Sequence, residues 1–161
     1  MMKVIKAVAL LLVAVLFLGG LCSCRAEEEL TVEEISSRLY EICLQNTETY
    51  EVSKADIENL FNFDGNLLDE YYVRMCDTDE RYLCVAVFRL KDENNRQTVI
   101  DGIDSTLKVA AASFGVLYNS EYDKIQHRLF YEYSDIIIFV VSDDYKPCED
   151  YLKEIGAAPI A

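Results

Sequence analysis

Two cysteines stand one residue apart in the segment Leu21-Cys22-Ser23-Cys24, between an apolar run and an acidic stretch. Bacterial lipoprotein signal peptides are cut just before a cysteine whose thiol receives a diacylglycerol. The peptidase prefers Leu three residues before that cysteine and Gly, Ala or Ser directly before it. Cys24 meets both preferences, whereas Cys22 would have Gly19 and the bulky Leu21 at these positions. The spacing therefore predicts Cys24 as the lipid attachment residue, with Leu21 and Ser23 as the peptidase recognition residues.

The residues before this motif are typical of a signal peptide. Lys3 and Lys6 precede an uninterrupted apolar run, residues 7–18. The run is shorter than the roughly 20 apolar residues of a membrane-spanning helix. We expect residues 1–23 to be a cleaved lipoprotein signal peptide and residues 24–30 to be an acidic tether. An uncleaved anchor and simple secretion are the alternatives, and all three hypotheses place the domain outside the cytoplasm, on the outer face of the cytoplasmic membrane if it is lipid-anchored.

The charge balance limits the partners of this chain. It carries 29 acidic and 15 basic residues, for a net charge of −14, and signal cleavage would remove two of the lysines. Such a surface repels nucleic acid and anionic lipid headgroups. We therefore expect no nucleic-acid partner, and contact with the membrane only through the lipid anchor.

Four further cysteines are an even number, which outside the cytoplasm favours disulfides. Cys76 and Cys84 flank a predicted hairpin turn, but a loop of even length would point their thiols to opposite faces of the sheet. Cys43 and Cys148, on two helices that could pack together, are the preferred disulfide candidates. Free, buried thiols are the alternative hypothesis. Metal binding by cysteine is not expected, because no CxxC spacing occurs.

The remaining residues that could do chemistry are few. His127 is the only histidine, and neither nearby serine has the context of a catalytic nucleophile. The acidic turns at 77–80 and 143–144 offer oxygen ligands for calcium, but neither matches an EF-hand loop. They are more simply explained as turn and helix-cap residues. We expect no catalytic residues, no metal and no cofactor.

Tyrosine is unusually frequent, with eleven residues. Five of these fall on the predicted sheet, and we expect four of the five to form a candidate aromatic binding face for a protein or glycan partner: Tyr72, Tyr82, Tyr131 and Tyr133. Half-buried tyrosine is also common on strands, which is the simpler interpretation.

Hydrophobic periodicity and turn signals predict the elements that position these residues. Thr31-Val32-Glu33-Glu34 is a capping box that opens a first helix, expected to end near residue 46. The further elements expected are a helix after Ser53, strands near 70–76 and 81–90, a helix over 95–120, strands at 127–133 and 136–142, and a helix over 147–155.

This order, ααββαββα, indicates an α+β fold. We expect a four-stranded antiparallel sheet of order 1-2-4-3, with the two fully apolar strands in the centre and the helices packed mainly on one face. One domain would cover residues 31–156, followed by a C-terminal tail at 157–161.

The segments LFNFDGNLLDEYYVRMCDTDERYLCVAVFRLKD and DIIIFVVSDD, with the long helix between them, resemble a family of small lipoproteins of Gram-positive bacteria that carry a domain of unknown function. The resemblance covers about residues 31–155. It implies the lipobox and the same order of elements, and it lends no catalytic residues. The chain departs from the family in its extra cysteines, and in lacking a proline between the long helix and the third strand.

Together these features favour a membrane-anchored, non-catalytic binding or protein-interaction module. A cell-envelope enzyme that uses acidic residues is one alternative. A structural accessory subunit of an envelope complex is the other.

Overall fold

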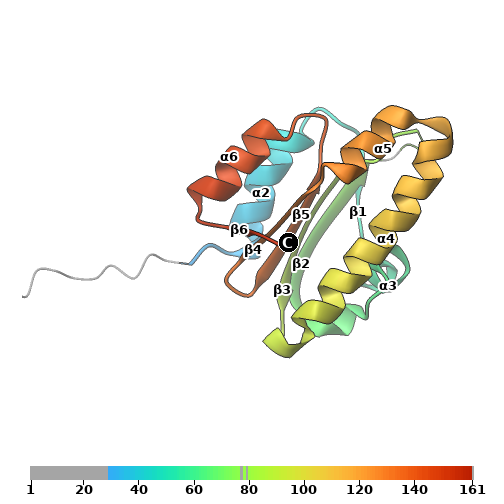
Figure 1. The fold of residues 1–161 in the computed structure, drawn as a ribbon. Coiled ribbons are helices and arrows are strands. Elements are labelled where there is room, and N and C mark those ends of the chain that lie inside the picture. The colour runs from blue at the N-terminus through green and yellow to red at the C-terminus, as the bar shows by residue number, and fades with distance from the viewer. Residues whose placement is uncertain (1–28, 77, 79, 161) are drawn as a thin grey trace, which may run out of the picture.

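The computed structural model describes residues 29–76, 78 and 80–160. In this part of the chain it contains five α-helices, two short 3-10 helices and six strands (Figure 1). The helices are α2 (Val32–Cys43), α3 (Lys54–Phe61), η1 (Gly65–Leu67), η2 (Glu93–Asn95), α4 (Arg96–Leu117), α5 (Asn119–Gln126) and α6 (Lys146–Glu154). The strands are β1 (Thr49–Glu51), β2 (Leu68–Cys76), β3 (Cys84–Leu90), β4 (Leu129–Tyr133), β5 (Ile136–Val141) and β6 (Ala158–Pro159).

The six strands form one antiparallel sheet with the order β1-β2-β3-β5-β4-β6. The central strands β3 and β5 pair from Cys84↔Val141 to Arg89↔Ile136. All six residues of β5 are buried, and so are all residues of β3 except Arg89. Because successive side chains point to opposite faces of a sheet, an uninterrupted buried strand requires cover on both faces.

Helices supply that cover on both faces, as Figure 1 shows. On one face, Ile35 and Leu39 of α2 and Leu152 of α6 pack against the side chains of β3 and β5. On the other face, α3 and α4 pack against the opposite side of the same strands, with Phe61 and Ile103 fully buried. The sheet therefore separates two apolar cores.

The sequence-based prediction of the fold is wrong in two respects. The sheet has six strands rather than four, and its helices lie on both faces rather than mainly on one. The four inner strands do follow the expected neighbour order, as β2-β3-β5-β4. The two extra strands, β1 and β6, add one short strand at each edge of the sheet.

The elements that the sequence did not predict are short or polar. β1 has three residues and β6 has two, so each depends on its partner strand rather than on a hydrophobic pattern of its own. The predicted helix over 95–120 ends early, because Tyr118 leaves helical geometry with φ −138° and ψ 80°. The chain then forms α5, whose only buried apolar residue is Ile125.

Gly102 of α4 lies where α4 crosses α3. A Cβ atom there would lie 2.6 Å from the carbonyl oxygen of Phe61 and 3.0 Å from that of Asn62. Gly102→Ala should therefore lower the free energy of unfolding by roughly 1–3 kcal/mol, since backbone atoms cannot move aside as a flexible side chain can. Urea denaturation followed by circular dichroism measures this.

Gly115→Ala, on the same helix, is the matched control for this prediction. Its Cβ would meet only the ring of Tyr122, at 3.2 Å, and that side chain is 40% exposed and free to shift. Alanine favours the helix by about 1 kcal/mol over glycine. We expect Gly115→Ala to be neutral or stabilising, and an equal loss in both variants would contradict the explanation.

Candidate functional site

The predicted lipid attachment residue Cys24 and its recognition residues Leu21 and Ser23 lie outside the described residues. The structure does describe where the chain joins the domain. The backbone N–H of Leu30 donates to the hydroxyl of Tyr133 over 3.3 Å, and Arg89 Nη2 donates to the carbonyl oxygen of Leu30 over 3.5 Å. Six residues beyond Cys24, the chain is therefore already bound to the sheet.

Helix α2 begins directly after this point. Thr31 Oγ1 accepts a hydrogen bond from the Glu34 N–H over 3.2 Å, and Glu34 Oε2 accepts one from the Thr31 N–H over 2.9 Å. This confirms the predicted capping box. In residues 29–76, 78 and 80–160, no helix is both long and apolar enough to cross a membrane.

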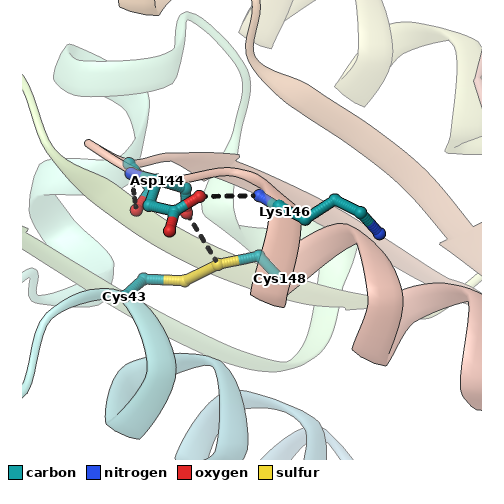
Figure 2. The surroundings of a disulfide bond; sticks show 5 residues. Cys43, Asp144, Lys146 and Cys148 are labelled. Atoms are coloured by element: carbon teal, nitrogen blue, oxygen red, sulfur yellow. Dashed lines mark hydrogen bonds between the residues drawn. A yellow bond between two sulfur atoms is a disulfide. The ribbon is translucent and has the colours of Figure 1, made fainter.

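Cys43 and Cys148, the preferred pair, are joined by a disulfide (Figure 2). Their sulfur atoms are 2.11 Å apart, and 105 positions separate them in the sequence. Cys43 is the last residue of α2 and Cys148 lies in the first turn of α6. Figure 2 also shows Asp144, whose carboxylate accepts a hydrogen bond of 3.1 Å from the backbone N–H of Lys146, the first residue of α6.

The other two described cysteines, Cys76 and Cys84, are free and buried on opposite faces of the sheet. Met75 pairs with Cys84, so the register lies two residues away from the one expected. An even shift leaves the faces unchanged. Burial raises the pKa of the Cys84 thiol far above its usual range, so this thiol stays protonated and unreactive.

The four candidate tyrosines do not form one exposed face. Tyr82 is 8% exposed and packs in the core beneath α4, while Tyr131, 6% exposed, lies in the core beneath α2 and α6. Tyr72 and Tyr133 pack at the margin of that second core. Tyr82 lies on one face of the sheet and the other three tyrosines lie on the opposite face, and helices cover both faces.

Of the other candidates from the sequence, Asp77 and Asp79 of the first acidic turn lie outside the described residues. His127 ends α5, and its Nδ1 lies 2.7 Å from the carbonyl oxygen of Asp123 in the same helix. Among the residues that the structure describes, no group of three His, Cys, Asp or Glu side chains could hold a metal ion.

An ionic network that the sequence did not predict joins α5 to the loops at the end of the sheet farther from Leu30. Lys124 Nζ lies 2.6 Å from Glu121 Oε1 and 2.7 Å from Asp143 Oδ1. Glu121 also accepts a 2.9 Å hydrogen bond from the backbone N–H of Tyr82, and Arg81 pairs with Asp143. The Glu121 side chain is only 8% exposed, so this carboxylate connects α5 to the segment that leads into β3.

The charges of this network shift the pKa values around it. Burial acts to raise the pKa of the Asp143 carboxyl, but the hydrogen bond and charge of Lys124, with the charge of Arg81, outweigh it and hold that pKa below its ordinary value. Burial raises the pKa of Tyr145 to about 12. Its hydroxyl therefore stays protonated and donates to the carbonyl oxygen of Lys124 over 2.5 Å. Each of these groups is therefore paired with another group of the protein.

A groove with a volume of about 630 Å³ lies between α4 and the edge of the sheet at β4 and β6. Its polar side chains come from α4, the end of α5 and the start of β4, and they are Gln97, Asp101, Asp104, Gln126 and Arg128. Ile100, Phe130 and Ile160 form its apolar part. This volume lies in the range of ligand sites, and the lining of the groove is more polar than the mostly apolar lining that such sites usually have.

Arg128 is the charged centre of this α4–β4 groove. Its Nη2 donates to Asp104 Oδ1 over 2.7 Å. Its Nε is buried and, within the described part of the chain, has no hydrogen-bond partner. A hydrogen bond from Lys108, aided by the charges of Lys108 and Arg128, lowers the pKa of Asp104. The sequence signal that was missed is the i, i+4, i+7 spacing of Gln97, Asp101 and Asp104 on one side of a predicted helix.

The fold and the groove define a small α+β domain, its antiparallel sheet covered by helices on both faces, with a groove at one sheet edge. The chain belongs to the family of the domain of unknown function DUF4358, whose model matches residues 43–142. That match spans β1 to β5, together with the end of α2. No curated protein and no solved structure matches the chain.

Proposed function

We propose that the protein is a lipoprotein anchored through Cys24 to the outer face of the cytoplasmic membrane of a Gram-positive bacterium, and that its domain binds a protein or glycan partner without catalysing a reaction. The lipobox Leu21-Cys22-Ser23-Cys24 carries the first part of the proposal. The position of Leu30 supports it. Six residues span at most about 20 Å, so the lipid would hold the bound end of the domain close to the membrane surface.

The first experiment is the intact mass of the full protein extracted from the membranes of the cells that produce it, with and without reductant. We expect the mass of Cys24–Ala161 plus a diacylglycerol, rising by two hydrogen atoms on reduction of the Cys43–Cys148 disulfide. Cys24→Ser should abolish both the lipid and the cleavage. A wild-type mass that starts at Met1 without lipid would overturn the anchoring.

The α4–β4 groove is the part of the surface best suited to the proposed binding. Its walls come from α4, the end of α5, β4 and β6, and the Gln126 side chain at its end is exposed. Gln126→Trp should therefore fill the groove without disturbing the fold. Asn59→Trp, an exposed position on α3, is the matched control.

Wild type and both variants would be tested against arrays of envelope glycans and against proteins cross-linked to them in intact cells. We expect the wild type and Asn59→Trp to bind the same ligands, and we expect Gln126→Trp to bind none of them. If the wild type binds nothing, the binding function fails. If Gln126→Trp binds normally, the groove is not the site.

A further inference from the structure

The outward side of the second half of α4 is uncharged and apolar. Val109 is 66% exposed, Val116 80% and Leu117 75%. Residues 109–120 contain no charged side chain, although 27% of the chain is Asp, Glu, Lys or Arg. Large aliphatic side chains with this exposure, grouped on one helix of a charged protein, indicate a surface that another molecule covers.

The spacing of the exposed residues along one side of α4 indicates what kind of surface would cover them. Ser105, Val109, Ala112 and Val116 are all exposed and follow one another at intervals of four, three and four residues. This is the a/d spacing of a helix that packs along another helix. The opposite side of α4, with Ile103, Leu107 and Ala111, is buried against the sheet, so the exposed residues form a second seam on the same helix.

We propose that this seam of α4, residues 105, 109, 112 and 116, packs against the same seam of a second copy of the chain. A protein of net charge −14 repels its own copies, and an uncharged surface is where two copies approach at least cost. The seam can fit itself, because an isologous contact sets the same patch of the two copies against each other. A basic partner would instead be expected to bind acidic side chains, which this seam lacks.

The ends of α4 determine the sense of packing. Arg96, its first residue, pairs with Glu132 near the β4–β5 turn, and Arg89 lies 3.6 Å from Asp135 of that turn while it also binds Leu30. The start of α4 and the start of the domain therefore share one end of the molecule. If both copies are anchored to one membrane, their α4 helices pack in parallel. This sense rests on the proposed anchoring, whereas the contact itself does not.

The contact is short, about three helical turns, so it buries less area than the roughly 800 Å² per partner of a stable interface. We expect weak association in solution. Confinement on a membrane raises the effective concentration and favours the dimer there.

Cysteine cross-linking of the full protein in its native membranes tests the dimer. Val116→Cys places a thiol at an exposed seam position, and Cys76 and Cys84 are buried and do not compete. We expect diamide to convert most of Val116→Cys into a disulfide-linked dimer on a non-reducing gel. Adding Val109→Glu, which places two carboxylates in the contact, should remove most of that dimer.

Lys108→Cys is the matched control, on the same helix and with a side chain that is 77% exposed. Position 108 lies beside the seam, where equivalent positions of two parallel helices are far apart. We therefore expect Lys108→Cys to stay monomeric. Equal cross-linking of both variants, or none of Val116→Cys, would overturn the proposal. The intact mass of the same samples reports the lipid separately. A cross-linked but unlipidated protein would refute the anchoring and leave the dimer standing.

Discussion

Replacing both Cys43 and Cys148 by alanine lowers the free energy of unfolding by roughly 4 kcal/mol. The expected size follows from the 105 positions that the disulfide closes into a loop, because a cross-link over about 100 residues removes that much chain entropy from the unfolded state. Cys148 is also fully buried, so its truncation adds a loss of packing. Urea denaturation of the oxidised protein, followed by circular dichroism, measures the difference.

Two controls separate the cross-link from the packing. Cys84→Ala removes a fully buried thiol that forms no disulfide, and it should cost only about 1 kcal/mol. Wild type measured in reductant should lose nearly as much stability as the double variant. Unchanged stability of the wild type in reductant would show that the disulfide contributes little.

Glu121→Ala is expected to lower the free energy of unfolding by roughly 2–4 kcal/mol. The substitution leaves the buried N–H of Tyr82 without its acceptor and removes one of the two carboxylates that neutralise Lys124. A buried donor without a partner costs about 1–3 kcal/mol, and breaking a buried ion pair costs more. Lys124 keeps Asp143, which limits the loss.

The comparison with Glu121→Gln distinguishes the two contributions. Glutamine keeps an oxygen for the Tyr82 N–H and loses the charge, so its loss should be smaller than that of Glu121→Ala. Lys146→Ala breaks an ion pair with Asp150 between exposed side chains and should cost less than about 1 kcal/mol. If Glu121→Ala costs no more than Lys146→Ala, the network does not stabilise the fold.

The inner part of the fold was predictable because its signals are local. Strands β3 and β5 are uninterrupted apolar runs, and the capping box at Thr31 specifies where α2 begins. The cover on both faces was implied by these same runs, since a strand that is apolar on both sides needs two layers. The sequence-based prediction placed these two strands at the centre of the sheet, but it expected helices mainly on one face.

The parts that the sequence did not predict depend on contacts between distant segments. β1 and β6 have too few residues for a periodic pattern. Glu121 looked like one of many surface acids, and only the folded chain brings it beside the Tyr82 N–H, 39 positions away. The α4–β4 groove likewise combines Gln97 and Asp101 with Arg128, which follows α5, a helix that the sequence pattern did not predict.

The position of the disulfide also decides how the domain bears a pulling force. A load applied between the N-terminal side of Leu30 and the C-terminal segment runs along α2 to Cys43, crosses the sulfur–sulfur bond to Cys148 and continues through α6. The 104 residues between the two cysteines, which include strands β1 to β5, lie outside this path. With the bond intact, tension would unravel only α2 and α6 and detach the edge strand β6, and strands β1 to β5 would stay folded without load.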